Sequence, residues 1–455
     1  MDNQLTGRRT TAALACVTGL VLAVVAAASA GPAAAAGHPS TVTDWNAAAG
    51  RAAVAACIAP FDDPLHESRM YAMTHLAVHD ALNAIDRRFE PYAADFTAPP
   101  GASPDAAVAA AAHDTLVATL AEIPAPFPQQ CRDAGIASVS ADYAAALAAI
   151  PAGAAKATGV ATGQHAAAAV LAERAGDGSD TQLIVADYPQ GTQPGQWRFT
   201  PERPFAFAPG WGSVRTFGLT GAGQFRVAPP LPLKSARYAA DVKEVKALGG
   251  DGVGTPTRRT AEQTEIARFW VESSPLSWNR LARTLAMSEA LDGWEQARLY
   301  GLLNIALTDG YIASFDSKYD YRFWRPVTAI REAASDGNRA TTADPGWTPL
   351  EITPPIPDHD SAHAVEGGAA AMVFRQFFGT DRHAFSHCST TVPTGGCTDA
   401  TPSLRHFTRF SQAAQENADS RVYIGFHFRH AAQAGLHRGE KVGRWVAQQL
   451  LQPLP

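Results

Sequence analysis

Apolar residues recur along most of this chain at the three- and four-residue spacing that places them on one face of a helix. In the first part of the chain, alanine-rich stretches with this spacing predict helices at residues 43–57, 68–84, 104–122, 138–150 and 153–175. In the second part, the same spacing predicts helices at residues 259–272, 278–308, 361–378, 403–417 and 426–450. No series of alternating polar and apolar positions predicts strands. We therefore expect an all-α protein made of packed helical bundles.

The segment at residues 176–235 interrupts this pattern. It is rich in glycine, proline and aromatic residues, as in the run YPQGTQPGQWRFTPERPFAFAPGWG, and it has few periodic positions. We expect a long ordered loop there. The chain then divides into residues 1–36, an N-terminal helical region at 37–255 that contains this loop, and a C-terminal helical bundle at 256–455.

The first 36 residues have the layout of an export signal. Arg8 and Arg9 precede the apolar run ALACVTGLVLAVVAAASA, which ends in small residues suited to cleavage around residues 28–30 or 33–36. A membrane anchor is the alternative, because about 18 apolar residues are long enough to span a bilayer. The small-residue exit favours a cleaved signal peptide, a secreted protein and no stable membrane span after cleavage. The twin-arginine and the general export route both stay open.

Composition narrows the class of protein. The hydrophobic share of 46% is sufficient for a substantial core and excludes a disordered chain. The net charge of −6 argues against a general nucleic-acid-binding or anionic-membrane surface. Any cationic site must therefore be local and built from a few placed residues.

The cysteines fit an oxidising compartment. Cys57, Cys131, Cys388 and Cys397 remain after the predicted signal peptide, and their number is even. Cys388 and Cys397 flank a polar loop rich in glycine and threonine, so they are the favoured disulfide pair. Four free buried thiols are the alternative.

Two histidines of the predicted helix at 68–84 lie four residues apart. His75 and His79 would share one helix face, where they could bind a metal. The H-x-x-x-H spacing alone is a weak signal, and hydrogen bonds between helices are the favoured interpretation.

Basic residues also stand in three apolar stretches that are far apart in the sequence. The first stretch is DSKYDYRFWRPVTAIR at residues 316–331. Pro326 disfavours helical geometry at Arg325, so we expect a broken segment that directs Lys318 and Arg325 to one point. A solvated basic edge is the alternative, but the surrounding aromatic residues would then form a large exposed apolar patch.

The second stretch is TPPIPDHDSAHAVEGGAAAMVF at residues 353–374. A helix is predicted to begin near Ser361, which places the backbone amides of Ala362 and His363 at a helix N-terminus, where anions bind. His359 and His363 also invite a zinc interpretation. That interpretation is weak, because the glutamate of H-E-x-x-H is missing and the prolines keep His359 off the helix.

The third stretch is SRVYIGFHFRH at residues 420–430. Arg421 and His427 are six residues apart and do not share one face of a straight helix. Gly425 permits a bend between them. We expect Arg421 to enter from just before the helix that carries His427; an amphipathic helix start with buried arginine stems is the alternative.

Together these stretches supply the groups that a small oxyanion requires. Lys318, Arg325 and Arg421 would neutralise its peripheral oxygens. One histidine could bond to the central atom, and a second could move protons on the open side. We therefore predict a closed anion pocket.

The three stretches also resemble the motif K-x6-R-P, S-G-H and S-R-x3-G-x-H of one superfamily, that of the vanadium-dependent haloperoxidases and type 2 phosphatidic acid phosphatases. This chain has Lys318 and Arg325-Pro326, then Ser361-Ala362-His363, and then Ser420-Arg421, Gly425 and His427. The runs HLAVHDALNAI, WGSVRTFGL and RTAEQTEIARFW are similar to the secreted bacterial haloperoxidase-like branch. The resemblance covers most of the chain after the predicted signal.

The resemblance implies an all-α bundle of the vanadium haloperoxidase and acid phosphatase type. It implies that Lys318, Arg325, Ser361, Arg421 and the amide of Ala362 hold the oxygens of vanadate or phosphate. It implies further that His427 is the axial ligand of vanadium and His363 the acid–base. The cofactor would be vanadate, and hydrogen peroxide and a halide would react there. The alternative is a secreted phosphatase without a cofactor, in which His427 attacks the phosphorus of a phosphate ester to give a phosphohistidine. A third possibility, a phosphate-binding protein, would need neither histidine.

This chain departs from the family pattern at three positions. Ala362 replaces the glycine between serine and histidine. Asp360 stands where proline is usual, so it either places a negative charge beside the anion site or caps the start of the helix. Ala431 occupies the place of an aspartate that supports the axial histidine in many members, and we expect His430 to substitute for it in part. By proximity in sequence, Phe315, Trp324 and Ile356 are expected on the halide side.

Overall fold

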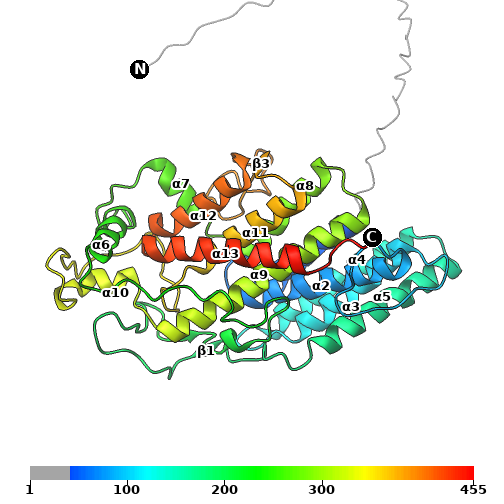
Figure 1. Cartoon of the computed structure of the whole chain (residues 1–455), viewed down its shortest axis with the longest axis horizontal. Coiled ribbons are helices and arrows are strands. Elements are labelled where there is room, and N and C mark those ends of the chain that lie inside the picture. The colour runs from blue at the N-terminus through cyan, green and yellow to red at the C-terminus, as the bar shows by residue number, and fades with distance from the viewer. Residues whose placement is uncertain (1–40) are drawn as a thin grey trace, which may run out of the picture. The chain divides into compact units, whose positions relative to one another are not determined.

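The computed structural model describes residues 41–455, which form a mainly helical fold (Figure 1). The helices up to residue 173 are α1 (Thr41–Ala55), α2 (Pro64–Ile85), α3 (Pro104–Ala121), α4 (Gln129–Ala149) and α5 (Ala154–Glu173). The later helices are α6 (Ala236–Leu248), α7 (Ala261–Phe269), α8 (Ser274–Ser288), α9 (Gly293–Tyr321), α10 (Pro326–Arg331), α11 (Ala362–Phe378), α12 (Phe410–Tyr423) and α13 (Arg429–Gln449). The predicted all-α class is confirmed. The signal peptide predicted at residues 1–36 lies outside the described residues.

Local capping chemistry corrects one predicted helix. The stretch at 278–308 is not a single helix, because α8 ends at Ser288 and α9 begins at Gly293. Asp292 caps α9, and its side chain accepts hydrogen bonds from the amides of Trp294 and Glu295, while Glu295 bonds back to the amide of Asp292. Such a capping box starts a new helix even where apolar spacing runs on unbroken. Helices α6 and α10 were not predicted at all.

Two small antiparallel sheets interrupt the helices. β1 (Ile184–Val185) pairs with β2 (Ala206–Phe207) inside the Gly/Pro-rich segment at 176–235, which also holds the short 3-10 helix η1 (Trp211–Ser213). A second 3-10 helix, η2 (Ala333–Ser335), follows α10. β3 (Arg382–His387) pairs with β4 (Arg405–Arg409). The predicted helix at 403–417 is therefore wrong over its first part, and α12 begins only at Phe410.

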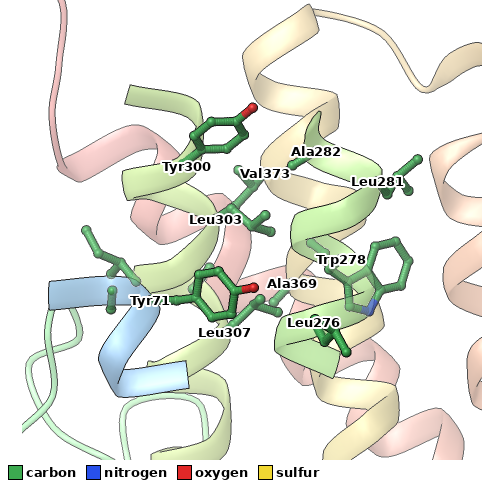
Figure 2. Close-up of a cluster of buried hydrophobic side chains, with 14 of the residues drawn as sticks. Tyr71, Leu276, Trp278, Leu281, Ala282, Tyr300, Leu303, Leu307, Ala369 and Val373 are labelled. Atoms are coloured by element: carbon green, nitrogen blue, oxygen red, sulfur yellow. The ribbon is translucent and has the colours of Figure 1, made fainter. Parts of the chain in front are cut away.

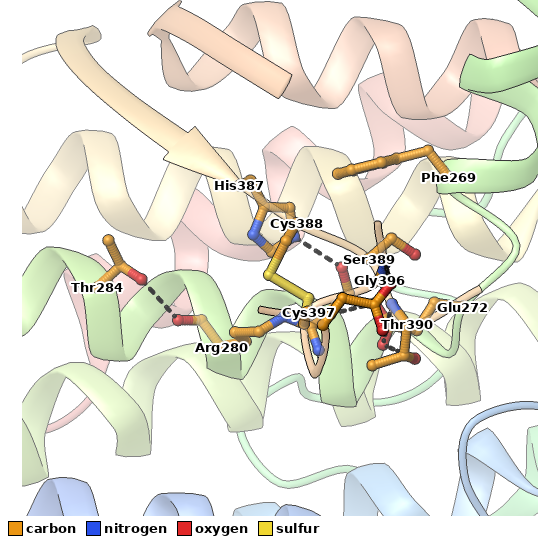
Figure 3. The surroundings of a disulfide bond; sticks show 12 residues. Phe269, Glu272, Arg280, Thr284, His387, Cys388, Ser389, Thr390, Gly396 and Cys397 are labelled. Atoms are coloured by element: carbon orange, nitrogen blue, oxygen red, sulfur yellow. Dashed lines mark hydrogen bonds and ion pairs between the residues drawn. A yellow bond between two sulfur atoms is a disulfide. The ribbon is translucent and has the colours of Figure 1, made fainter. Parts of the chain in front are cut away.

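Two disulfides cross-link the part of the chain that the structure describes. Cys57, just after α1, is bonded to Cys131 in α4. Cys388 is bonded to Cys397, the pair favoured by the sequence, and closes the loop that follows β3 (Figure 3). Thr390 of this loop donates a hydrogen bond to the carboxylate of Glu272, so the loop is tied to the connection between α7 and α8.

Glycines permit α11 and α13 to pack backbone against backbone. A side-chain carbon at Gly439 would lie 2.0 Å from the carbonyl oxygen of Val365, and one at Gly443 would lie 2.3 Å from that of Ala369. At the start of α11 the same approach occurs, since a carbon at Gly435 would lie 2.5 Å from the carbonyl oxygen of Ser361. The stripe of glycines on α13 therefore fixes the position of the α11 N-terminus.

A shared core joins the two predicted parts of the chain. Figure 2 shows Tyr71 of α2 close to Leu303 and Leu307 of α9, with Trp278 of α8 and Ala369 of α11 on the other side. All of these side chains are buried in one cluster. The domain boundary between residues 255 and 256 stays a prediction. Among residues 41–455, no helix is both long enough and apolar enough to cross a bilayer.

Candidate oxyanion site

The chain break after α9 brings the first two cations together. Helix α9 ends at Tyr321, and its C-cap residue Arg322 adopts a left-handed conformation. Arg325 is then the N-cap of α10, which begins at Pro326. Lys318 is buried in the last turn of α9, where its Nζ donates to the carbonyl oxygens of Pro357 and Asp358, each at 3.0 Å. The structure therefore has the broken segment that the sequence predicted.

Arg325 extends from that break into the interior. Its Nε donates to the carbonyl oxygen of Ile356 at 2.6 Å, and its Nη1 donates to that of Phe426 at 2.9 Å. The same Nη1 lies 3.0 Å from Nε2 of His427. Arg325 thus links the 353–361 segment to the connection between α12 and α13.

Helix α11 begins where the sequence predicted. Ser361 is its N-cap, and the amide of Ser361 donates to the carbonyl oxygen of Ala431 at 3.1 Å. The side chain of Ala362 is buried in a cluster with Phe315 and Trp211, so the extra methyl has an apolar environment. His363 follows on the first turn and is anchored through its carbonyl oxygen, which accepts from Asn417 at 2.8 Å.

Arg421 lies on α12, the helix before the bend. Its Nε donates to Oγ of Ser420 at 2.9 Å, and its Nη2 donates to the carbonyl oxygen of Trp270 at 2.7 Å. The backbone of Val271 and Glu272, which follow Trp270, lies next to the ring of His363. The connection between α7 and α8 therefore supports both Arg421 and His363.

A glycine bend separates Arg421 from His427. Gly425 has a φ of +87°, and a side-chain carbon there would lie 2.7 Å from the carbonyl oxygen of Gly249, so only glycine fits. His427 lies in the connection after this bend, whereas α13 begins at Arg429. The expectation that His427 sits on the helix is therefore wrong, and its backbone amide instead donates to the carbonyl oxygen of Arg421 at 3.2 Å.

His427 has a carboxylate partner that the motif does not contain. Its Nδ1 lies 2.9 Å from Oδ1 of Asp358, and both residues are buried. The expected substitute, His430, does not take this place, because its ring stacks on the ring of His359 at 5.2 Å. Asp358 lies two residues before Asp360, in a proline-rich run. The sequence analysis missed it because only its charge distinguishes it from its neighbours.

Asp360 does not cap α11, and its charge is paired within the protein. Its Oδ1 accepts from Oγ of Ser314 at 2.7 Å, and its Oδ2 lies 3.4 Å from Nη1 of Arg438. Both members of this pair are buried, and Arg438 of α13 also donates to Oγ of Ser317 at 2.7 Å. Sequence reasoning missed Arg438 because it lies outside the three stretches.

The charges of the site act on one another. Burial, followed by the charge of Arg325, lowers the pKa of Lys318 to about 7. Burial lowers the pKa of Arg325 to about 10 and that of Arg421 to about 9. The pKa of His427 is held well below its ordinary value by burial and then by Arg325, Lys318 and Arg421, with His363 also contributing. All five predicted groups therefore share one electrostatic environment, and a bound anion would relieve the strain among them.

Several buried atoms of the site have no partner within hydrogen-bond geometry. They are Nη2 of Arg325, Oγ of Ser361 and Nε2 of His363. A buried polar group left without a hydrogen bond costs about 1–3 kcal/mol, so a ligand that accepts hydrogen bonds from these three groups would stabilise them. All three can donate a hydrogen bond, and positive charges surround them. These residues fit a vanadate or phosphate anion.

The other candidate metal sites have different explanations. Nε2 of His75 accepts from Asn46 at 2.8 Å, and Nδ1 of His79 lies 3.1 Å from Oδ1 of Asp80, so each ring has a polar partner within the helices. His359 Nε2 donates to the carbonyl oxygen of Ala228 at 2.9 Å. Within the described part of the chain, no group of three or more His, Cys, Asp or Glu residues is placed to hold a metal ion.

Phe315 and Ile356 pack in the same hydrophobic cluster as Ala362, whereas Trp324 packs in the main hydrophobic core. The place of these three residues on the halide side stays a prediction.

Comparisons with known proteins agree on the architecture. Residues 298–454 match the family model of the VCPO second helical-bundle domain. The chain is 26% identical over 295 residues to the vanadium chloroperoxidase of Curvularia inaequalis, covering 51% of this chain and 48% of that protein. The chain thus spans about half the length of this curated relative.

Solved structures of vanadium-dependent haloperoxidases match a larger share of the chain. One described as the first bacterial vanadium-dependent iodoperoxidase has a TM-score of 0.72 and 24% identity, covering 90% of this chain and 96% of its own. An apo-type bacterial vanadium-dependent chloroperoxidase has a TM-score of 0.62 and 15% identity, covering 85% and 94%. These likenesses establish a shared fold.

Proposed function

We propose, from the premise that this chain belongs to the vanadium haloperoxidase superfamily, that it is a secreted enzyme that oxidises a halide with hydrogen peroxide at a bound vanadate. The observation that carries the proposal is the set of buried donors without partners around Arg325, Ser361 and His363. Every residue proposed for the site lies within the matched range 298–454.

The binding roles follow from the contacts. Lys318, Arg325 and Arg421 would neutralise the oxygens of the anion, and the free Nη2 of Arg325 and Oγ of Ser361 would donate to them. The amide of Ala362, in the first turn of α11, would add a helix-terminus donor. A vanadate held there supplies a Lewis-acid centre that activates hydrogen peroxide toward a halide.

The two histidines would do different work. Asp358 would accept a hydrogen bond from Nδ1 of His427, which puts the lone pair of the ring on Nε2. In the vanadate-free chain Nε2 faces Nη1 of Arg325 at 3.0 Å, and it would bind the central atom of the anion in place of that contact. His363 is half-buried, and desolvation followed by the charge of Arg421 holds its pKa well below the ordinary value, so its ring is neutral and able to take up a proton. A negative charge beside it would raise that pKa and make it a better proton carrier.

Peroxide-dependent bromination of a phenolic dye, with and without added vanadate, tests this function. We expect bromination only when vanadate is present, and we expect His427→Ala to abolish it. Unchanged turnover in His427→Ala would remove this histidine from the mechanism.

A phosphatase is the alternative because the same donors suit a phosphate ester. In that case His427 would bond to phosphorus and His363 would protonate the leaving alcohol. Hydrolysis of a phosphate ester that vanadate inhibits, without bromination, would favour the phosphatase. Neither activity, with phosphate still bound, would favour a binding protein.

Secretion is supported by the two disulfides, Cys57–Cys131 and Cys388–Cys397, which are typical of oxidising compartments. Expression of the full chain followed by N-terminal sequencing of the protein outside the cell tests it. We expect a mature N-terminus near residues 28–37; a full-length chain that stays with the cells would contradict it.

A further inference from the structure

The partner of His427 is fixed from several directions. The amide of Asp358 donates to the carbonyl oxygen of Phe323 at 2.9 Å, and its carbonyl oxygen accepts from Nζ of Lys318 at 3.0 Å. The side chain then meets Nδ1 of His427 at 2.9 Å. Because the backbone is held by the break between α9 and α10, the carboxylate has little freedom to leave the histidine.

In many family members the carboxylate that supports the axial histidine stands four residues after that histidine, and this chain has an uncharged residue there. Ala431, four residues after His427, is a buried alanine on the first turn of α13. Ala431 and Asp358 line the same small pocket, so the two positions are neighbours. The carboxylate that contacts His427 therefore comes from the segment before α11 and not from α13.

We propose that Asp358 is the positioning residue of His427. Asp358 fixes the ring orientation and the tautomer in which Nε2 carries the lone pair. The proposal rests on the proposed function for the identity of the anion. The contact between Asp358 and His427 is independent of that function.

Orthovanadate binding, measured by titration calorimetry, tests the proposal in four variants. Asp358→Ala and the isosteric Asp358→Asn should weaken binding by about 10- to 100-fold, the usual loss when such a supporting group is removed. Adding Ala431→Asp to Asp358→Ala should restore at least about tenfold of that loss, because the two positions are neighbours. The control is Asp80→Ala, which removes a buried carboxylate far along the chain that contacts His79 and accepts from the backbone amides of residues 92–94.

The control should change orthovanadate affinity by less than about twofold, even where urea unfolding shows lower stability. Wild-type affinity in both Asp358 variants, or an equal loss in Asp80→Ala, would overturn the proposal.

A second readout does not depend on vanadate. In protein labelled with nitrogen-15 at histidine, NMR of the vanadate-free chain should show His427, assigned by its loss in His427→Gln, as the tautomer protonated at Nδ1. Asp358→Ala should give a mixture of tautomers. If the wild type binds no oxyanion, the proposed function fails, and this spectrum still decides the role of Asp358: a tautomer unchanged in Asp358→Ala would refute it.

Discussion

Asp360 and Arg438 form a buried ion pair, which we expect to compensate the negative charge that Asp360 places beside the anion site. The closest atoms are 3.4 Å apart and both side chains are fully buried. With an effective dielectric constant of about 20, two unit charges at this distance attract by about 5 kcal/mol. Asp360→Asn removes the negative partner and leaves Arg438 buried without it. We expect a loss of about 3–5 kcal/mol in the free energy of unfolding.

A double-mutant cycle isolates this pair. Arg438→Met alone should also destabilise the protein and leave the charge of Asp360 uncompensated, so phosphate binding should weaken. The double variant Asp360→Asn with Arg438→Met removes both charges, and its free energy of unfolding should lie closer to that of the wild type than either single variant does.

Urea unfolding measures the stabilities, and titration with phosphate measures the affinities. A cost below about 1 kcal/mol for Asp360→Asn would show that the pair behaves as an exposed one and would refute this reasoning.

Two further predictions concern the free energy of unfolding. Replacing Cys57 and Cys131 by serine should lower it by about 4.5 kcal/mol, and replacing Cys388 and Cys397 should lower it by about 2.7 kcal/mol. The first loss is larger because that disulfide closes a longer loop, with sequence separations of 74 and 9; equal shifts in the urea midpoint would contradict this order. Burial raises the pKa of Glu67 to about 8, so the folded state keeps a proton that the unfolded state releases, and stability falls as pH rises from about 4.5 to about 8. Glu67→Gln should stabilise the protein by a few kcal/mol at pH 8 and have little effect below pH 4, since one pKa unit corresponds to about 1.36 kcal/mol; a stability difference that does not depend on pH would refute it.

The sequence predicted the parts of the site that depend on local signals. Pro326 forces the break at Arg325, and the proline-rich approach to Ser361 sets the start of α11. Gly425 marks the bend before His427, although the exact start of α13 was placed too early. Each of these features is decided by backbone preferences within a few residues.

The features that were missed depend on contacts across the fold. Asp358 and His427 are 69 residues apart in the sequence, and Asp360 and Arg438 are also distant, so no local pattern pairs them. The strand β4 is short and adjoins a true helix, so its pairing with β3 was hidden by the periodic residues of α12. Pairing between charged residues or short strands that are far apart in the sequence could therefore not be predicted from local patterns.

A crystal structure of the protein soaked with orthovanadate tests the central claim, that three distant segments build one oxyanion site. The account predicts an anion bonded to Nη2 of Arg325 and to Oγ of Ser361, with Lys318 and Arg421 around it and Nε2 of His427 on the vanadium. An anion bound elsewhere, or none at this site at millimolar orthovanadate, would contradict it.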